Sequence, residues 1–491
     1  MKKVTSELKK TDITNPVSVF ILWWMMIVVP LYVENRYFNI LQAKGHAFDA
    51  GCIAGAILIA FSVLGNKYVT KLKPKASLTD AGIVIMACAA IISCFLCGSF
   101  KAAFWGEQGW CVGGFAFLMG AILYMYLSKS FYMSQNFWLP VIAVNIFIFV
   151  VGIMHSAGTD VLGIHKNIDP SQFYLYMSTI GNVNWFSGYL CLLIPMFACF
   201  YIGAKGIASQ IIYILILALG ELNMVLTGSD SLLLGLGVCA FFALPYVFRT
   251  KISAARFSGL VVIYGLASML VAIHPAFAEK SAMIDGLSAF FLKQPVYIGL
   301  IAVGIIAILV FSLMNESAAK KLCKVIIIAG EIALAAAVIY FAYKTVGSFG
   351  VRWGSYRGSI WKKAVEVFAG LGPVNKIFGV GPEMLGQYFK DMPVGFTRRV
   401  LAAHSEPLQI LLSMGIAGLT GWILMWAGII KRFFTGKLWR TPVMAFYLPL
   451  MAYLGQSTVN TPMATNFGMM IVMVSLFVYN SERIKIKDNL E

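Results

Sequence analysis

The residues best suited to chemistry lie in one polar segment, residues 344–405, of an otherwise strongly apolar chain. Basic side chains outnumber acidic ones there by nine to three, and the segment ends at His404 and Ser405. Guanidinium groups bind phosphate oxygens in pairs, and an imidazole with a pKa near ~6.5 can accept a proton from a hydroxyl group. The segment therefore predicts a diphosphate site with an acid–base group beside it. Its basic residues are Lys344, Arg352, Arg357, Lys362, Lys363, Lys376, Lys390, Arg398 and Arg399.

A helix start directly after His404 strengthens this prediction. Ser405 is suited to the N-cap, Glu406 to the first turn, and Pro407 is tolerated there. A helix that begins here directs the positive end of its dipole toward the polar segment, where it favours an anion. The predicted diphosphate ligands are Arg352, Arg357, Arg398 and Arg399, and the predicted catalytic residues are His404 and Arg357.

Two shorter patterns give the polar segment internal order. Residues 359–368 predict an amphipathic helix lying at the membrane surface, because their apolar side chains recur at helical spacing. The predicted apolar stripe consists of Ile360, Ala364, Val365 and Phe368. Further along, Gly379 and Gly381 allow the backbone to approach a ligand or a neighbouring segment closely.

The rest of the chain determines the protein class. Hydrophobic residues make up 60% of the 491 residues and charged residues only 12%, which excludes a soluble domain and favours an integral membrane protein. The apolar runs are long enough to cross a bilayer as helices, and they predict one all-α domain, 1–491, with about 14 spans (12–14) and one large loop, 344–407. The expected spans are 17–33, 48–66, 81–99, 112–128, 137–155, 185–203, 209–227, 231–248, 257–273, 295–314, 325–343, 408–430, 442–458 and 464–480.

Lysine and arginine predict the orientation. With both termini in the cytoplasm, 23 of the 38 basic residues fall on the cytoplasmic side and 15 outside, nine of them in the large loop. The other connections therefore show a strong excess of positive charge inside, as is usual for membrane proteins. The large loop breaks this rule and is predicted to lie outside, which is a further reason to expect that its charges hold an anion.

At this point the chain resembles the O-antigen ligase and polymerase superfamily. The His404-x10-Gly415 spacing is similar to the signature of that family, and Arg357-Gly-Ser-Ile-Trp361 to its Arg-x-x-Ile-Trp element. Residues 378–381 fit its loop glycines, and residues 181–189 are similar to a recurrent upstream stretch. The resemblance covers roughly 175–475. One departure is Asp230, which stands where many members have an arginine, and another is Ser405, where the family often has asparagine.

The resemblance implies a glycosyltransferase of the GT-C type in the bacterial cytoplasmic membrane, active on its outer face. Its donor is a glycan linked to undecaprenyl diphosphate, and its acceptor is a hydroxyl group of a glycan, lipid or protein. The reaction implied is inverting and uses neither a metal nor a cofactor, with arginines on the diphosphate and His404 as base or as diphosphate ligand. Arg352, Arg398 or Arg399 could supply the charge that Asp230 lacks.

Two alternatives stay open. The protein could be a surface-polysaccharide polymerase of the same superfamily, although the His-x10-Gly spacing favours a ligase. It could also be a polytopic transporter, because Glu221 and Glu331 lie within predicted spans, yet no pair of broken short helices at matched positions supports that class. His155 and His274 are expected to face lipid headgroups, and Glu383 to pair with a loop arginine.

Overall fold

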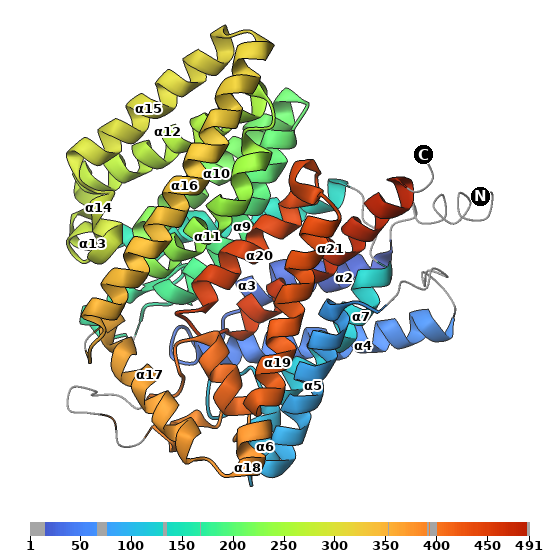
Figure 1. The fold of residues 1–491 in the computed structure, drawn as a ribbon. Helices are drawn as coiled ribbons and strands as arrows, with labels where there is room; N and C mark the ends of the chain where they lie inside the picture. The colour runs from blue at the N-terminus through green and yellow to red at the C-terminus, as the bar shows by residue number, and fades with distance from the viewer. Residues whose placement is uncertain are drawn as a thin grey trace.

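The computed structural model describes residues 15–65, 76–130, 135–166, 168–351, 353–389, 392 and 400–488. Nearly every described element is a helix, and most of the long helices run side by side as a bundle (Figure 1). Helices α17 and α18 lie at the bottom of that view, whereas α21 ends at the upper right. We call the end that carries α17, α18 and His404 the loop end.

The helices have the following bounds: α2 Pro16–Trp23, α3 Val29–Leu31, α4 Ile40–Leu64, α5 Leu78–Leu96, α6 Phe100–Trp105, α7 Gly114–Ser130, α8 Leu139–Ser156, α9 Val183–Gly203, α10 Ile207–Thr227, α11 Asp230–Val247, α12 Lys251–Ile273, α13 Ala278–Ala282, α14 Gly286–Phe290, α15 Gln294–Leu313, α16 Glu316–Ser348, α17 Trp353–Gly370, α18 Pro373–Phe378, α19 Glu406–Thr435, α20 Met444–Ser457 and α21 Ala464–Asp488. One π-turn, Trp24–Val28, joins α2 to α3. Two short antiparallel strands, β1 Tyr176–Met177 and β2 Gly181–Asn182, pair Tyr176 with Asn182 and precede α9.

The prediction of a polytopic all-α membrane protein is confirmed. Among the described residues, 11 helices are long and apolar enough to cross a membrane. The other three expected spans coincide with shorter helical segments, namely Pro16–Leu31, α7 and α20. The count of 14 crossings is therefore not established, although hydropathy placed a helix in every expected span.

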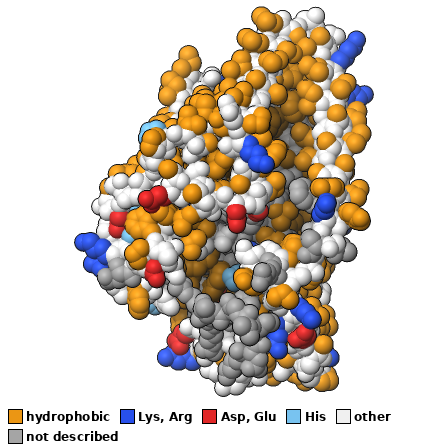
Figure 2. Space-filling view, turned by 90° about the vertical axis from the view of Figure 1, so that its left-hand side faces the viewer, with side chains coloured by type: hydrophobic (Ala, Val, Ile, Leu, Met, Phe, Trp, Pro, Cys, Tyr) orange, Lys and Arg blue, Asp and Glu red, His pale blue; other side chains and the backbone are white. Residues whose placement is uncertain are grey.

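The helices differ sharply in how much protein surrounds them. In the most apolar window of each span, 83% of α9 and 94% of α21 is buried, against 17% of α15 and 0% of α16. α9 and α21 therefore form the centre, and α15 and α16 expose apolar side chains at the edge. Figure 2 shows that hydrophobic side chains cover most of the upper half of this side of the molecule, while acidic ones are concentrated in its lower half. Such an apolar surface suits lipid rather than water.

At the loop end, a break in α19 joins it to the polar segment. Gly415 has φ 66° and ψ −165°, a conformation that is essentially restricted to glycine. The break leaves the carbonyl groups of Leu412 and Ser413 free, and they accept hydrogen bonds from the N–H groups of Val380 (2.9 Å) and Gly381 (3.0 Å). A Cβ atom on Gly379 would lie 2.2 Å from the Ser413 backbone. The glycines of the polar segment thus approach a neighbouring segment, one of the two roles predicted for them.

The predicted amphipathic helix forms, but its apolar face meets protein. After left-handed residues 354–356, α17 buries Ile360 and Ala364 in a small core with Val380, Leu385 and Phe389. Val365, predicted to lie on this face, is 60% exposed. The predicted apolar stripe was wrong at Val365 because α17 packs on the small core of the loop, which contacts Ile360 and Ala364.

Candidate active site

Four segments far apart in the sequence meet at the loop end. They are the start of α17, the residues before α19, the connection between α6 and α7, and the turn between α20 and α21. Polar and aromatic side chains from these segments contact His404 and Arg357.

Arg357 is held in place by the turn between α20 and α21. Its Nε donates to the carbonyl oxygen of Val459 (2.7 Å), and a terminal nitrogen donates to Oδ1 of Asn460 (3.0 Å). A second terminal nitrogen donates to the Gly354 carbonyl (2.9 Å). The remaining guanidinium N–H groups have no partner among the described residues, so they are available to phosphate oxygens. Burial lowers the pKa of Arg357, and the charge of Asp230 opposes this effect.

His404 directly precedes Ser405, the N-cap residue of α19, and has a left-handed backbone conformation with φ 48°. Its ring packs edge-to-face against Trp110, with 5.5 Å between the centroids. Burial lowers the pKa of His404 to about 4, and the positive charge of Arg357 adds to the shift. The imidazole is therefore neutral at physiological pH and can accept a proton. The electrostatic influence of Arg357 on His404 confirms that the two predicted residues lie near one another.

Trp110 connects His404 to a buried carboxyl group. Oε2 of Glu383 accepts a hydrogen bond from the Trp110 backbone N–H (2.7 Å), and a Cβ on Gly109 would lie 1.8 Å from this oxygen. Burial raises the pKa of Glu383 to about 8, although the hydrogen bond from Trp110 opposes the shift. Glu383 forms no ion pair with Arg357, the one loop arginine among the described residues, and its predicted pairing with a loop arginine otherwise concerns residues outside the described part of the chain.

The turn between α20 and α21 brings several polar groups to the same place. Buried polar atoms of Asn460, Thr461, Thr465 and Asn466 have no hydrogen-bond partner among the described residues. Other atoms of this group are anchored: Nδ2 of Asn466 donates to the Trp185 carbonyl (3.1 Å). Trp185 in turn packs edge-to-face on Trp110. Unpaired buried polar groups are costly in an isolated protein, and they are suited to bind the hydroxyl groups of a sugar.

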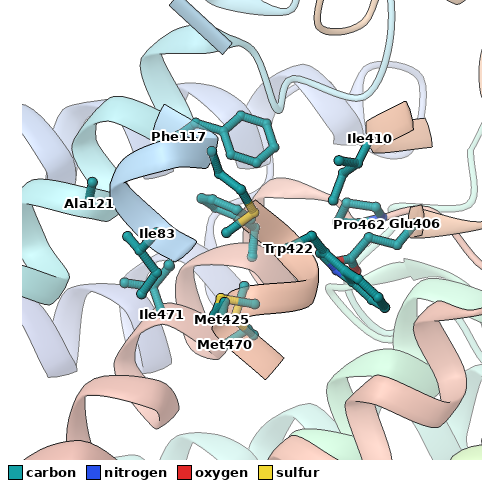
Figure 3. A pocket seen from close by; sticks show the side chains of 12 residues that line it. Ile83, Phe117, Ala121, Glu406, Ile410, Trp422, Met425, Pro462, Met470 and Ile471 are labelled. Carbon is teal, nitrogen blue, oxygen red and sulfur yellow. The ribbon is translucent and has the colours of Figure 1, made fainter. Parts of the chain in front are cut away.

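Glu406, two residues after His404, is held by two hydrogen bonds. Its Oε1 accepts a hydrogen bond from Nε1 of Trp422 (2.9 Å), and its Oε2 accepts one from the Tyr453 hydroxyl (3.0 Å). Figure 3 shows Glu406 beside Trp422 and Pro462, at the edge of a narrow cavity of about 20 Å³ whose other walls are apolar. A space of this size accepts about one water molecule. The two hydrogen bonds therefore fix the carboxyl group of Glu406 at the edge of this cavity.

Two sequence predictions at this end need correction. Ser405 occupies the N-cap position of α19, but its side chain makes no capping hydrogen bond. Gln409 Oε1 instead accepts from the N–H of Ala403 (2.8 Å), before the helix begins. His155, expected to face headgroups, is 1% exposed, whereas His274 is exposed as predicted.

Asp230, the departure from the family pattern, has a structural role. Its carboxylate accepts hydrogen bonds from the backbone N–H groups of Leu287 (3.1 Å) and Ser288 (2.9 Å), and from the Ser288 hydroxyl. It therefore fixes α14 to the start of α11. Arg352, Arg398 and Arg399, three of the four predicted diphosphate ligands, lie outside the described residues.

The sequence did not single out Trp110 or the polar turn 458–466, and it included Trp185 only as part of the stretch 181–189. A signal for the turn was present, because residues 456–466 are unusually rich in Asn, Gln, Ser and Thr for a connection between two apolar runs. Trp110 gave none, since its importance depends on contacts with Glu383 and His404, which are distant in sequence.

Comparison with known proteins gives a family match for the part of the chain that contains this site. Residues 290–423 match the family model described as O-antigen ligase, and this segment contains both Arg357 and His404. A comparison with curated proteins gives no match. The matched segment runs from the residues before α15 to the middle of α19. The chain is therefore a polytopic membrane protein that contains a segment, residues 290–423, similar to the O-antigen ligase family.

Proposed function

We propose that this protein is a membrane glycosyltransferase that moves a glycan from undecaprenyl diphosphate to an acceptor hydroxyl. The observation that carries the proposal is the pairing of Arg357 with His404, inside the family domain, beside unpaired polar groups. In this proposal the loop end faces the outside of the bacterial cytoplasmic membrane, and both termini lie in the cytoplasm. The reaction uses neither a metal nor a cofactor.

Arg357 is the proposed diphosphate ligand. Its side chain is fixed by Val459, Asn460 and Gly354, so its free N–H groups are oriented before the donor arrives. Charge builds on the diphosphate oxygen as the bond to the sugar breaks, and fixed donors stabilise such charge by ~10²–10³ in rate per donor. Arg352, Arg398 and Arg399 remain proposed as further ligands.

His404 is the proposed general base. The acceptor hydroxyl loses its proton to the neutral imidazole while its oxygen forms a bond to the anomeric carbon. The bond from that carbon to the lipid diphosphate breaks, and the diphosphate leaves with the electron pair. Attack opposite the leaving group inverts the anomeric configuration. The lowered pKa of His404 favours this role over the alternative of a cationic diphosphate ligand.

The polar turn is the proposed sugar site. The unpaired groups of Asn460, Thr461 and Asn466 can hydrogen-bond to glycan hydroxyls, and Trp110 and Trp185 offer aromatic faces at the same place. We favour a ligase over a polymerase because of the His-x10-Gly spacing. Both readings use the same site.

The decisive experiment uses purified protein in nanodiscs with a glycan linked to undecaprenyl diphosphate. Release of lipid diphosphate and the size of the glycan product are followed for wild type, His404→Ala and Arg357→Ala, both with and without EDTA. Lys362→Ala is the matched control, since Lys362 is exposed on the same helix as Arg357. We expect both site variants to lose at least ~10²-fold in turnover and the control to keep it.

The outcomes separate the alternatives. Products that lengthen in repeat steps would identify a polymerase, and transfer of whole glycan to a different acceptor would identify a ligase. Equal donor binding by wild type and Arg357→Ala would contradict the diphosphate site. Absence of both turnover and donor binding would favour the transporter.

A further inference from the structure

A second cluster of ionisable side chains lies away from Arg357 and His404, where α8 ends. His155 is in the last turn of α8, and Asp160 and His165 follow in the connection that leads to β1. His155 is 1% exposed and His165 is 5% exposed. Two buried histidines beside a half-buried carboxylate, at the end of a predicted membrane span, require an explanation.

Their donor atoms have the spacing of a metal site. Nε2 of His155 lies 3.4 Å from Oδ1 of Asp160, and Nδ1 of His165 lies 3.7 Å from the same oxygen. All three atoms lie within 4.8 Å of one another. A tetrahedral zinc ion with bonds of ~2.0–2.1 Å holds its ligands roughly 3.3–3.4 Å apart. The carboxylate oxygen is thus close to the required distance from both rings.

The two ring nitrogens that face this point are buried and have no hydrogen-bond partner among the described residues. The far nitrogen of His165, Nε2, lies 3.0 Å from the Tyr176 carbonyl oxygen. A carbonyl can only accept, so Nε2 carries the proton and Nδ1 presents its lone pair toward Asp160. Histidines that bind metals commonly donate their other N–H to a backbone carbonyl in this way.

We propose that His155, Asp160 and His165 bind a divalent transition metal of the zinc class. Two neutral imidazoles and one carboxylate suit zinc, and the fourth position is left to water or to another small ligand. Three protein ligands with an open fourth position are usual for a catalytic zinc site, but we assign this metal a structural role, since its ligands bridge a helix end to a connecting segment and do not include Arg357 or His404.

His155 limits how tightly the metal is held. Its Nδ1 lies 3.1 Å from the Ser178 N–H and 3.2 Å from the Tyr37 hydroxyl oxygen. Because an N–H must donate, the metal-free ring carries its proton on Nε2. Metal binding shifts that proton to Nδ1, where the Tyr37 oxygen can accept it, and the Ser178 N–H loses its acceptor. Because this hydrogen bond is lost, we expect chelators to remove the metal readily.

The site has a structural connection to the reaction centre. Tyr37 and Ile164 form a small core to which Trp185 also contributes, and Trp185 packs on Trp110 beside His404. Residues 157–182 lead directly into β2 and α9. A metal at His155, Asp160 and His165 would fix the segment that positions Trp185.

The test measures binding of Co²⁺, a spectroscopic substitute for Zn²⁺, to full-length protein without an affinity tag after EDTA treatment. Wild type is expected to bind one equivalent, with the visible absorption of a four-coordinate nitrogen and oxygen site, and Zn²⁺ should displace it. His165→Ala and the isosteric Asp160→Asn are expected to weaken binding by at least ~10-fold. His274→Ala is the matched control, because His274 is an exposed histidine at the end of α12.

Several results would overturn the proposal. Wild type that binds Co²⁺ no better than Asp160→Asn would show that the cluster is a hydrogen-bonded network without metal. Absorption typical of thiolate ligation would assign the metal to cysteines instead, and loss of binding in His274→Ala would assign it to the surface. No donor or acceptor is present, so these results are independent of the proposed glycosyl transfer.

Discussion

At the scale of the residue, the surroundings of His404 and Arg357 determine their chemistry. Two positive or potentially positive side chains at one site repel each other, and burial adds to this effect by lowering the pKa of His404 to about 4. In the proposed reaction, Arg357 therefore remains charged and binds an anion, while His404 stays neutral and accepts a proton. This division of roles leads to a prediction about pH.

We expect kcat/KM to be independent of pH above about 5 and to fall as pH drops through about 4, because protonation of His404 in the free protein removes the base. The bound diphosphate stabilises the imidazolium, so the acid limb of kcat should lie at higher pH than that of kcat/KM. Pre-steady-state and steady-state rates from about pH 3 to pH 8 would check this. An acid limb of kcat/KM near ~6.5, the ordinary histidine value, would contradict the described environment.

Glu383 gives a second prediction at this scale, about stability. Its pKa is about 8 in the folded protein, well above the usual glutamate value of ~4.3. Between these two values the unfolded chain has lost the proton and the folded protein has kept it, so stability falls as pH rises through this window. Thermal unfolding in detergent from pH 5 to 9 should show this slope in wild type and a smaller slope in Glu383→Gln.

Glu366→Gln is the control for that experiment. Glu366 is an exposed residue of the same loop, and its carboxylate lies 3.9 Å from the ammonium group of Lys363. It should keep the slope of wild type. An unchanged slope in Glu383→Gln would mean that Glu383 is ionised, and Trp110 would then be bound by a carboxylate.

At the scale of the element, the break in α19 is the feature that unites the two motifs of the family. Gly415 opens the helix, and residues 380–381 bind the carbonyl groups that the break frees. Neither motif has this geometry alone, so a change in one disturbs the other.

We therefore expect Gly415→Ala to destabilise the protein by at least ~1–3 kcal/mol, from the backbone conformation alone. Its new Cβ would also lie 2.3 Å from the carbonyl carbon of Ile377. Gly237→Ala is the matched control, since Gly237 lies inside α11 and nothing lies within 4 Å of a Cβ there. Thermal unfolding and turnover would compare the two. Equal stability of both variants would show that the break is not required.

Sequence reasoning located the elements better than the site. Hydropathy placed a helix in every expected span, because a membrane helix must bury all its backbone groups and shows this in its own composition. The motifs placed Arg357 and His404 together. They could not indicate Trp110, Glu383 or Asn460 as neighbours, because those contacts join distant segments. The prediction that Val365 lies on the buried face of its helix failed for a related reason. The helix packs on a core that includes Val380, Leu385 and Leu412, which are distant in sequence.

At the scale of the whole molecule, the proposed orientation is directly testable. The loop end should face outward, so a cysteine in place of Lys362 on α17 should react with a membrane-impermeant maleimide in intact cells. A cysteine in place of Lys437, exposed between α19 and α20, should react only after permeabilisation. Wild type supplies the background from its nine native cysteines. The reverse pattern would place the site in the cytoplasm.

The poor burial of α16 has a consequence for the setting in which this protein works. The helix contains 33 residues, about 50 Å at ~1.5 Å per residue, whereas the hydrocarbon core is ~30 Å thick. It packs mainly on α11 and α12 and leads into α17, which carries Arg357. A helix that exceeds the membrane thickness adjusts by tilting or by extending into the headgroup region. We therefore expect membrane thickness to influence the position of Arg357. The acyl-chain length of the lipids used for reconstitution should then affect the geometry of the site.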